Sequence, residues 1–169
     1  MGSFAKLLTS LAVLALAGAP QFVRAAAEPP QTRVANPTRD FRKGVEDIHA
    51  GRLEQAEATA LGLMAALPQD SSGRHLMGLV KTRKGDLAGA VAEFDKALEA
   101  DPQSINARTE RAVVLARLGL LERSRADLEA LRARAAACAK ACALELKAAI
   151  SRVEAALAAG GARAPERAA

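Results

Sequence analysis

The only two cysteines, Cys138 and Cys142, are four residues apart, and this spacing permits a disulfide under one structural condition. In a continuous helix, side chains four residues apart have Cβ atoms about 5–6 Å apart, whereas a disulfide needs about 3.5–4.5 Å. A bridge therefore requires a helix to end between the two positions. A redox-active pair is one alternative, although the spacing is CxxxC rather than CxxC and no thioredoxin-like βαβ pattern accompanies it. Free thiols on one continuous helix are the other.

No other residue pattern points to catalysis or to a metal. The sequence has no GxSxG elbow, no Walker loop and no GxGxxG after a strand. His49 and His75 are the only histidines, and without an HExxH motif or a nearby acidic third ligand they make an incomplete metal site. We therefore expect a protein that is not an enzyme, with no cofactor, no metal and no small-molecule substrate.

Charged residues of both signs are interleaved along the chain. The acidic pairs Glu46-Asp47 and Glu93/Asp95 are predicted to be solvated helix surface. The same is expected of an arginine-rich stretch with acids between its bases: Arg123, Arg125, Asp127, Glu129, Arg132 and Arg134. An acidic partner or an anionic lipid surface is the alternative for that stretch. A nucleic-acid binder would concentrate its bases on one face or in one run, so nucleic acid is not expected as a partner.

The composition predicts an all-α fold. Of 169 residues, 50% are hydrophobic but only 2% are aromatic, with no Trp and no Tyr. Strands of sandwiches and barrels draw on aromatic and β-branched residues, whereas Ala, Leu, Glu, Lys and Arg, which dominate here, favour helices. The formal net charge of +5 is too low, and the apolar share too high, for a disordered chain.

The first 27 residues have the pattern of a secretory signal peptide. Lys6 precedes an apolar run over 7–18, and the small residues Ala25-Ala26-Ala27 offer a cleavage site. An uncleaved anchor is the alternative, but about 12 apolar residues are fewer than the roughly 20 needed to span a bilayer. We expect a bacterial protein exported to the periplasm or secreted, with residues 28–36 as a Pro-containing linker.

A period of 34 residues organises the rest of the chain. A shift of 34 places Gly44 on Gly78, Gly51 on Gly85, Leu53 on Leu87, Ala56 on Ala90 and Pro68 on Pro102. Gly51, Gly85 and Gly119 fall where a helix should end in the left-handed conformation, and Asp86 can cap the next helix. The mid-helix Gly44 and Gly78 indicate close approach of a neighbouring element, because glycine there costs about 1 kcal/mol relative to alanine.

The period predicts three helix pairs and a seventh helix. The pairs are expected at 37–50 with 53–67, 71–84 with 87–100, and 105–118 with 121–136. The seventh, at 141–158, carries an apolar stripe and should cover the exposed face of the last pair. Gly160-Gly161 should end it, leaving 159–169 as a flexible tail.

The 34-residue unit resembles the tetratricopeptide repeat (TPR) family. Residues 71–104 match its pattern best, with Gly78, Gly85, Ala90, Phe94, Ala97 and Pro102. Units 37–70 and 105–138 match less fully. Position 4 of the unit, often Trp in the family, is Asp40, Arg74 and Arg108, and position 11, often Tyr, is Asp47, Lys81 and Leu115. The resemblance implies an α-solenoid over 37–158, formed by three helix-turn-helix repeats and a capping helix.

The resemblance also implies a binding groove along the first helices of the repeats, through positions 2, 5, 9, 12 and 13. The expected lining is Phe41, Val45, Ile48, His49, Ser72, His75, Leu79, Thr82, Arg83, Asn106, Thr109, Val113 and Arg117. Core packing is the alternative for Val45, Leu79 and Val113. One TPR subclass grips a chaperone's C-terminal carboxylate with Lys and Asn at positions 5 and 9, which are Phe41 and Val45 here, so that mode is not inherited.

The repeat register places a turn at Cys138, the last residue of the third unit, so we predict a disulfide between Cys138 and Cys142 that pins the third pair to the capping helix. The leading functional hypothesis is a non-enzymatic exported scaffold or assembly factor that binds a protein or peptide in its groove. The alternative is a thiol–disulfide factor that uses the two cysteines. Self-association through an end of the array is a third hypothesis.

Overall fold

The fold is all-α, as predicted. A computed structural model describes residues 36–138 and 140–163, and these contain seven α-helices and no strand. The helices are α1 Pro37–His49, α2 Leu53–Ala66, α3 Ser71–Lys84, α4 Leu87–Ala100, α5 Ile105–Arg117, α6 Leu121–Ala137 and α7 Lys140–Arg163. The first six begin at the predicted residues and end within one residue of the predicted ends. The expected signal peptide, residues 28–35 and residues 164–169 lie outside the described part of the chain.

The turns inside the three pairs depend on glycine. Gly51, Gly85 and Gly119 have φ of +75°, +85° and +77°, a conformation that side-chain-bearing residues rarely adopt. In the second pair, the Asp86 side chain then accepts a hydrogen bond of 2.9 Å from the Gly89 amide and caps α4. The recurring glycines therefore end the first helices of the pairs, as expected.

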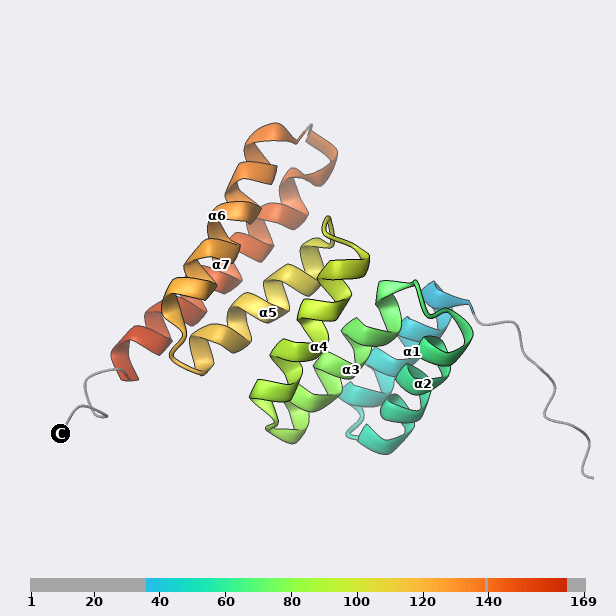
Figure 1. Cartoon of the computed structure of the whole chain (residues 1–169). Helices are drawn as coiled ribbons and strands as arrows, with labels where there is room; N and C mark the ends of the chain where they lie inside the picture. Colours follow the sequence, from blue (N-terminus) through green and yellow to red (C-terminus); the bar gives the residue numbers. More distant parts are fainter. Residues whose placement is uncertain (1–35, 139, 164–169) are drawn as a thin grey trace, which may run out of the picture. The chain divides into compact units, whose positions relative to one another are not determined.

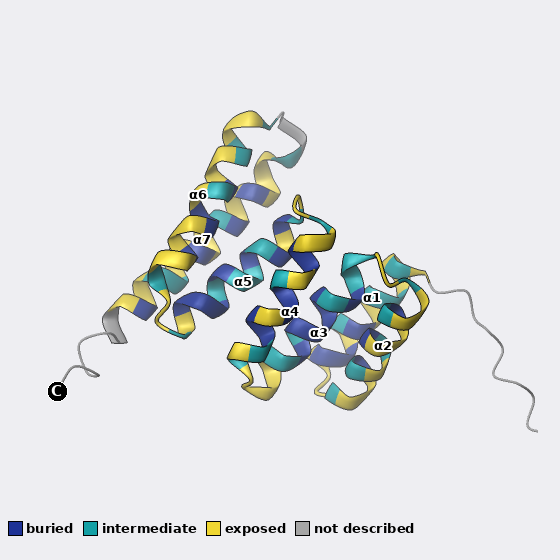
Figure 2. Cartoon of the chain, in the orientation of Figure 1, coloured by how far each residue is buried: buried dark blue, intermediate teal, exposed yellow. Residues whose placement is uncertain are grey.

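The helices stack in the order of a solenoid (Figure 1). Helices α1 and α2, α3 and α4, and α5 and α6 form pairs, and the second helix of each pair packs on the first helix of the next. First helices also contact one another, with α1 against α3 and α5 against α7. Figure 2 shows the buried residues where these helices face each other.

Mid-helix glycines allow large side chains to enter. A Cβ on Gly44 would lie 2.2 Å from Cδ2 of Leu76, and a Cβ on Gly78 would lie 2.5 Å from Cε1 of Phe94. Leu76 and Phe94 are fully buried, at 0% exposure. The small residues therefore seat the largest core side chains, which is the close approach that the period indicated.

Helix α7 is longer than predicted and does not end at Gly160-Gly161. It has 24 residues and α6 has 17, whereas the other helices have 13 or 14. Gly160 is buried because α7 presses on the end of α5, where a Cβ would lie 2.6 Å from the carbonyl oxygen of Ala116. Residues 159–163 are thus helical rather than part of a tail. None of the described helices combines the length and the apolar character needed to cross a membrane.

Candidate functional site

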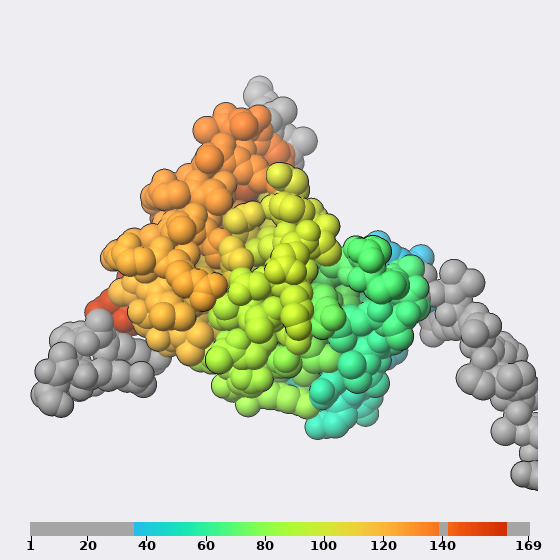
Figure 3. Space-filling view, in the orientation of Figure 1, coloured from blue at the N-terminus to red at the C-terminus, as the bar shows by residue number. Residues whose placement is uncertain are grey.

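Three first helices carry the expected lining residues in the same register. Positions 5, 9 and 13 of each repeat are four residues apart, so they share one face of the helix. They are Phe41, Val45 and His49 on α1, His75, Leu79 and Arg83 on α3, and Thr109, Val113 and Arg117 on α5. We call this face of α1, α3 and α5 the groove. Figure 3 shows α2, α4 and α6 covering much of the face in view, with α1 and α7 largely hidden behind them.

Exposure rises along the groove from position 5 to position 13. His75 and Thr109 are buried at position 5, whereas His49, Arg83 and Arg117 are exposed at position 13. Among the remaining expected lining residues, Asn106 is exposed and Ile48 is buried. The others are half-buried: Phe41, Val45, Ser72, Leu79, Thr82 and Val113. The open edge of the groove therefore lies at the C-terminal ends of its helices.

Two expected lining residues belong to the core instead. Ile48 is 6% exposed and packs in a cluster with Leu76 and Val80. Thr109 is 1% exposed, and its hydroxyl donates a 2.7 Å hydrogen bond to the Ile105 carbonyl. Neither side chain can touch a partner, so we leave both out of the groove.

His75 is a buried aromatic residue at the groove floor rather than a polar lining residue. Its ring centroid lies 4.9 Å from that of Phe41 and 5.8 Å from that of Phe94. Burial lowers the pKa of His75 to about 4, so the imidazole is neutral at pH 7. In residues 36–138 and 140–163, no group of three or more His, Cys, Asp or Glu side chains could hold a metal ion.

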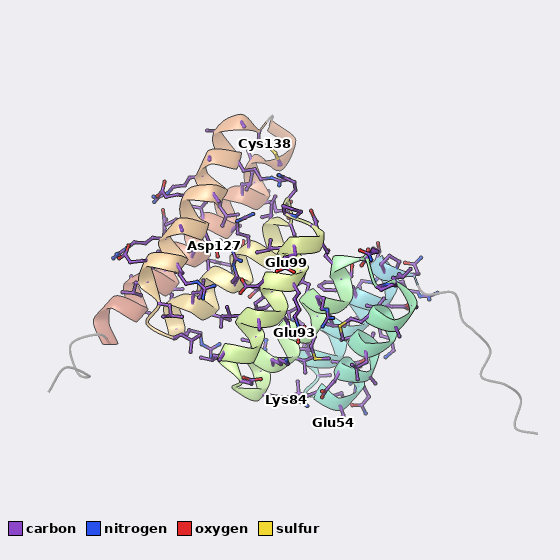
Figure 4. The ribbon with its side chains drawn as sticks, viewed as in Figure 1. Glu54, Lys84, Glu93, Glu99, Asp127 and Cys138 are labelled. Atoms are coloured by element: carbon purple, nitrogen blue, oxygen red, sulfur yellow. A yellow bond between two sulfur atoms is a disulfide. The ribbon has the colours of Figure 1, made fainter. Side chains whose placement is uncertain are left out.

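Glu93 is a buried carboxylate, not the solvated surface expected from its sequence. It is 7% exposed and accepts hydrogen bonds from Lys81 Nζ at 2.9 Å and Arg74 Nη1 at 3.1 Å. Figure 4 shows it at the junction of α3 and α4. Burial acts to raise the pKa of Glu93, but the two hydrogen bonds outweigh burial and leave that pKa lowered. The carboxylate is therefore charged at pH 7 and ties the two helices together.

Asp127 and Asp47 are buried in the same way, at 3% exposure each. Arg111 binds Asp127 through Nη2 at 2.6 Å and Nε at 2.9 Å, and this pairing raises the pKa of Arg111. Hydrogen bonds from Lys43 and Arg52 lower the pKa of Asp47. Neither aspartate is the solvated acid that was expected.

A sequence signal for two of these pairs was present. Arg74 and Lys81 occupy positions 4 and 11 of the second repeat, where the family often has Trp and Tyr, and Arg108 occupies position 4 of the third. Glu93 and Asp127 both occupy position 23. Bases at positions of a missing aromatic residue, together with an acid at position 23, indicate an ion pair between the helices of a repeat.

The α6–α7 hairpin breaks between the two cysteines, as a disulfide requires. Helix α6 ends at Ala137, Cys138 is extended with φ −89° and ψ 138°, and α7 begins at Lys140. The Cα atoms of Cys138 and Cys142 are 6.2 Å apart, within the range of bridged pairs. Figure 4 places Cys138 at the tip of the hairpin. The geometry is compatible with the bridge, which stays a prediction.

A hollow between the α4–α5 loop and the end of α6 has its polar groups occupied. Its lining includes Ser104, Ile105, Leu131 and the two arginines Arg108 and Arg134. Arg108 donates to the Pro102 carbonyl at 2.7 Å, and Arg134 donates to Gln103. Since these guanidinium groups hold the loop, the groove is the stronger candidate.

Comparisons with solved structures match this architecture. No family model and no curated protein matches the chain. Two structures of yeast Sti1 do, each with a TM-score of 0.58 and 18% identity over 70% of this chain. One is its TPR2B domain in complex with pHsp70, of which 96% is covered, and the other its TPR2AB domain in complex with pHSP90, of which 46% is covered. The chain therefore has the fold of a TPR α-solenoid.

Proposed function

We propose that this chain is a non-enzymatic protein that binds a peptide or protein partner in the groove of α1, α3 and α5. The observation that carries the proposal is the register of the groove. In each repeat a half-buried apolar side chain at position 9 (Val45, Leu79 and Val113) is followed one helical turn later by an exposed basic side chain at position 13. Both similar structures are complexes, one with pHsp70 and one with pHSP90. Phe41 and Val45 stand where one TPR subclass has its clamp residues, so a different partner is expected.

The proposed setting is the bacterial envelope, where the chain acts as an exported scaffold or assembly factor. This part of the proposal depends on the leader sequence alone: Lys6, the apolar run and Ala25-Ala26-Ala27. Expression in a bacterial host should yield a mature chain that begins at Glu28. Mass spectrometry of the periplasmic fraction measures this, and an unprocessed chain in the cytoplasm would contradict export.

Site-specific photocrosslinking tests groove binding directly. A crosslinking amino acid in place of the half-buried Leu79 should give discrete adducts with partner proteins in an envelope extract. The matched control places it at Ala126, an exposed position on α6 outside the groove. The variant Val45→Glu should weaken the Leu79 adducts, because a charge in an apolar contact is costly. Adducts of equal yield from both positions, or none from Leu79, would contradict the proposal.

The alternative is a thiol–disulfide factor that uses Cys138 and Cys142, which are half-buried in the α6–α7 hairpin. Its test is the reduction potential of the Cys138–Cys142 pair. A structural bridge should have a potential below about −300 mV, and a catalytic one well above it. The thiol content of the non-reduced protein, measured beside Cys138→Ser, establishes first whether the bridge forms.

A further inference from the structure

Three basic side chains stand at one repeat position and are bound to nothing in the described part of the chain. His49, Arg83 and Arg117 occupy position 13, in the last turns of α1, α3 and α5. All three are exposed, and within residues 36–138 and 140–163 none of their side chains makes a hydrogen bond or an ion pair. We call these residues the basic row. It follows the open edge of the groove across three repeats.

The basic row is an exception among the cations of these helices. Lys81 and Lys84 lie in the same last turn as Arg83, but Lys81 binds Glu93 and Lys84 binds Glu57. On α5, Arg108 and Arg111 both bind Asp127. A base in the last turn complements the helix dipole, and Lys81 and Lys84 do this while they are also paired with acids. The helix dipole alone therefore does not explain why the basic row is unpaired.

The groove beside the row carries no competing acid. The lining at position 2 is neutral and polar on α3 and α5, with Ser72 and Asn106, and position 9 is apolar. Of the other acids on these helices, Glu110 pairs with Arg152 at 2.8 Å, and Glu46 lies 3.9 Å from Arg42. A bound chain thus meets a neutral edge, an apolar floor and a basic edge.

The chain's own outer segments do not offer a matching occupant. Residues 1–35 contain one acid, Glu28, against Lys6, Arg24 and Arg33. Residues 164–169 contain Glu166 beside Arg167. Neither segment has the repeated carboxylates that three separated bases would pair with, so neither is the proposed occupant.

We propose that the groove takes an extended acidic segment of a partner protein, with separate carboxylate side chains facing the basic row. This inference rests on the proposed groove binding and names its partner class. The bases stand on successive repeats, so the carboxylates of an extended segment would meet them one after another.

The bases are spread along the groove, one to each repeat, rather than gathered at one point. A chain terminus would need several donors around its two carboxylate oxygens, whereas a row of single bases fits single side chains at intervals. The segment is therefore internal to its partner, and an amidated peptide should bind as well as one with a free carboxylate.

The test uses the full mature chain and fluorescent, C-terminally amidated 12-residue peptides. The probe has Asp at every third position with Leu and Ser between. One control peptide has Asn in place of Asp, and another has the same composition with its aspartates clustered. The spaced acidic peptide should bind at least tenfold more tightly than the Asn peptide, and its affinity should fall as salt rises.

Charge-neutral variants locate the contact. Arg83→Gln/Arg117→Gln should weaken binding of the spaced acidic peptide by about two- to thirtyfold, as expected for two exposed ion pairs. The matched control is Lys96→Gln, an exposed lysine on α4 outside the groove, which should bind like the wild type. Circular dichroism verifies that the variants stay folded.

Other outcomes overturn the inference and are separable from failure of groove binding. Equal affinity for the Asp and Asn peptides means that the groove binds chains without reading charge. An equal loss in Lys96→Gln means non-specific attraction, and a preference for the clustered peptide or for a free terminus means a different geometry. If none of the peptides binds, the acidic class is wrong, and the crosslinks from Leu79 show independently whether the groove binds another kind of partner.

Discussion

His75 shows how a single residue connects the groove to the stability of the fold. Its imidazole lies between the rings of Phe41 on α1 and Phe94 on α4, so it joins the first repeat to the second. At 9% exposure, the ring packs as an aromatic residue and must stay neutral to do so. A chain that was expected to use this histidine as a polar groove contact uses it as part of the floor.

Acid should destabilise the protein through His75. Burial lowers the pKa of His75 from 6.5 to about 4, so between these values the unfolded chain binds more protons than the folded one. The free energy of unfolding should therefore fall by about 2 kcal/mol between pH 7 and pH 5. Urea denaturation at both pH values measures this. His75→Phe should lose most of the pH dependence, whereas the exposed His49→Gln should keep it; equal slopes for all three would contradict the assignment.

Removal of the Glu93 charge should also destabilise the fold. Glu93→Gln leaves Arg74 and Lys81 facing a neutral amide, and because both bases are partly exposed we expect a loss of about 1–3 kcal/mol. Chemical denaturation at pH 7 measures the change. Glu99→Gln, at an exposed position on the same helix, is the control and should change stability by less than about 0.5 kcal/mol. A similar small effect for Glu93→Gln would show that the buried pair adds nothing.

At the scale of elements, α7 differs from the other first helices. The Arg152–Glu110 pair and the contact of Gly160 with Ala116 show that α7 runs parallel to α5. Because α6 and α7 are longer than the helices before them, this pairing is out of step with the 34-residue period. Helix α7 packs more closely on α5 than α5 packs on α3.

Two adjacent glycines in α7 should respond to alanine with opposite signs. A Cβ on Gly160 would lie 2.6 Å from a backbone oxygen, so Gly160→Ala should cost about 1–3 kcal/mol. Nothing lies within 4 Å of a Cβ on Gly161, so Gly161→Ala should stabilise the helix by about 0.5–1 kcal/mol. Thermal unfolding of the two variants makes the comparison, and destabilisation of equal size at both sites would argue against tight α7–α5 packing.

At the scale of the whole molecule, stability depends on the closure of the array by its last helix. Leu146, Ala149 and Val153 of α7 share one hydrophobic cluster with Leu128 and Leu131 of α6. No repeat of this length buries its apolar face alone, so each relies on its neighbour. The third repeat packs on α4 at one side, and α7 covers its other side.

A chain that ends at Ala137 should therefore lose several kcal/mol of stability and associate. Its exposed cluster would contain side chains worth about 1.5–3 kcal/mol each when buried. Thermal melting and light scattering measure the two effects. A chain that ends at Arg163 is the control, since it keeps all of α7, and it should behave like the full chain. A monomeric, equally stable chain ending at Ala137 would contradict the capping role.

The helix bounds could be predicted from sequence because their signals are local. Gly51, Gly85 and Gly119 end helices by their own backbone conformation, and the apolar period identifies the faces between them. For the groove, the sequence predicted which residues share one helix face, but not which of them are exposed. Whether a side chain of the expected lining is exposed depends on the packing around it, and Ile48 and Thr109 are buried too deeply for a partner to reach them.

The amino-acid sequence alone determined the all-α class, the number of repeat pairs and the turns, since these follow from composition, from the 34-residue period and from local glycine signals. Only the tertiary structure decided how deeply the paired acids are buried, how long α7 is and how it rests on α5. Those features depend on distances between residues far apart in the chain, such as Glu93 and Arg74 or Gly160 and Ala116. Helix packing sets these distances, and the spacing of residues along one helix does not encode them.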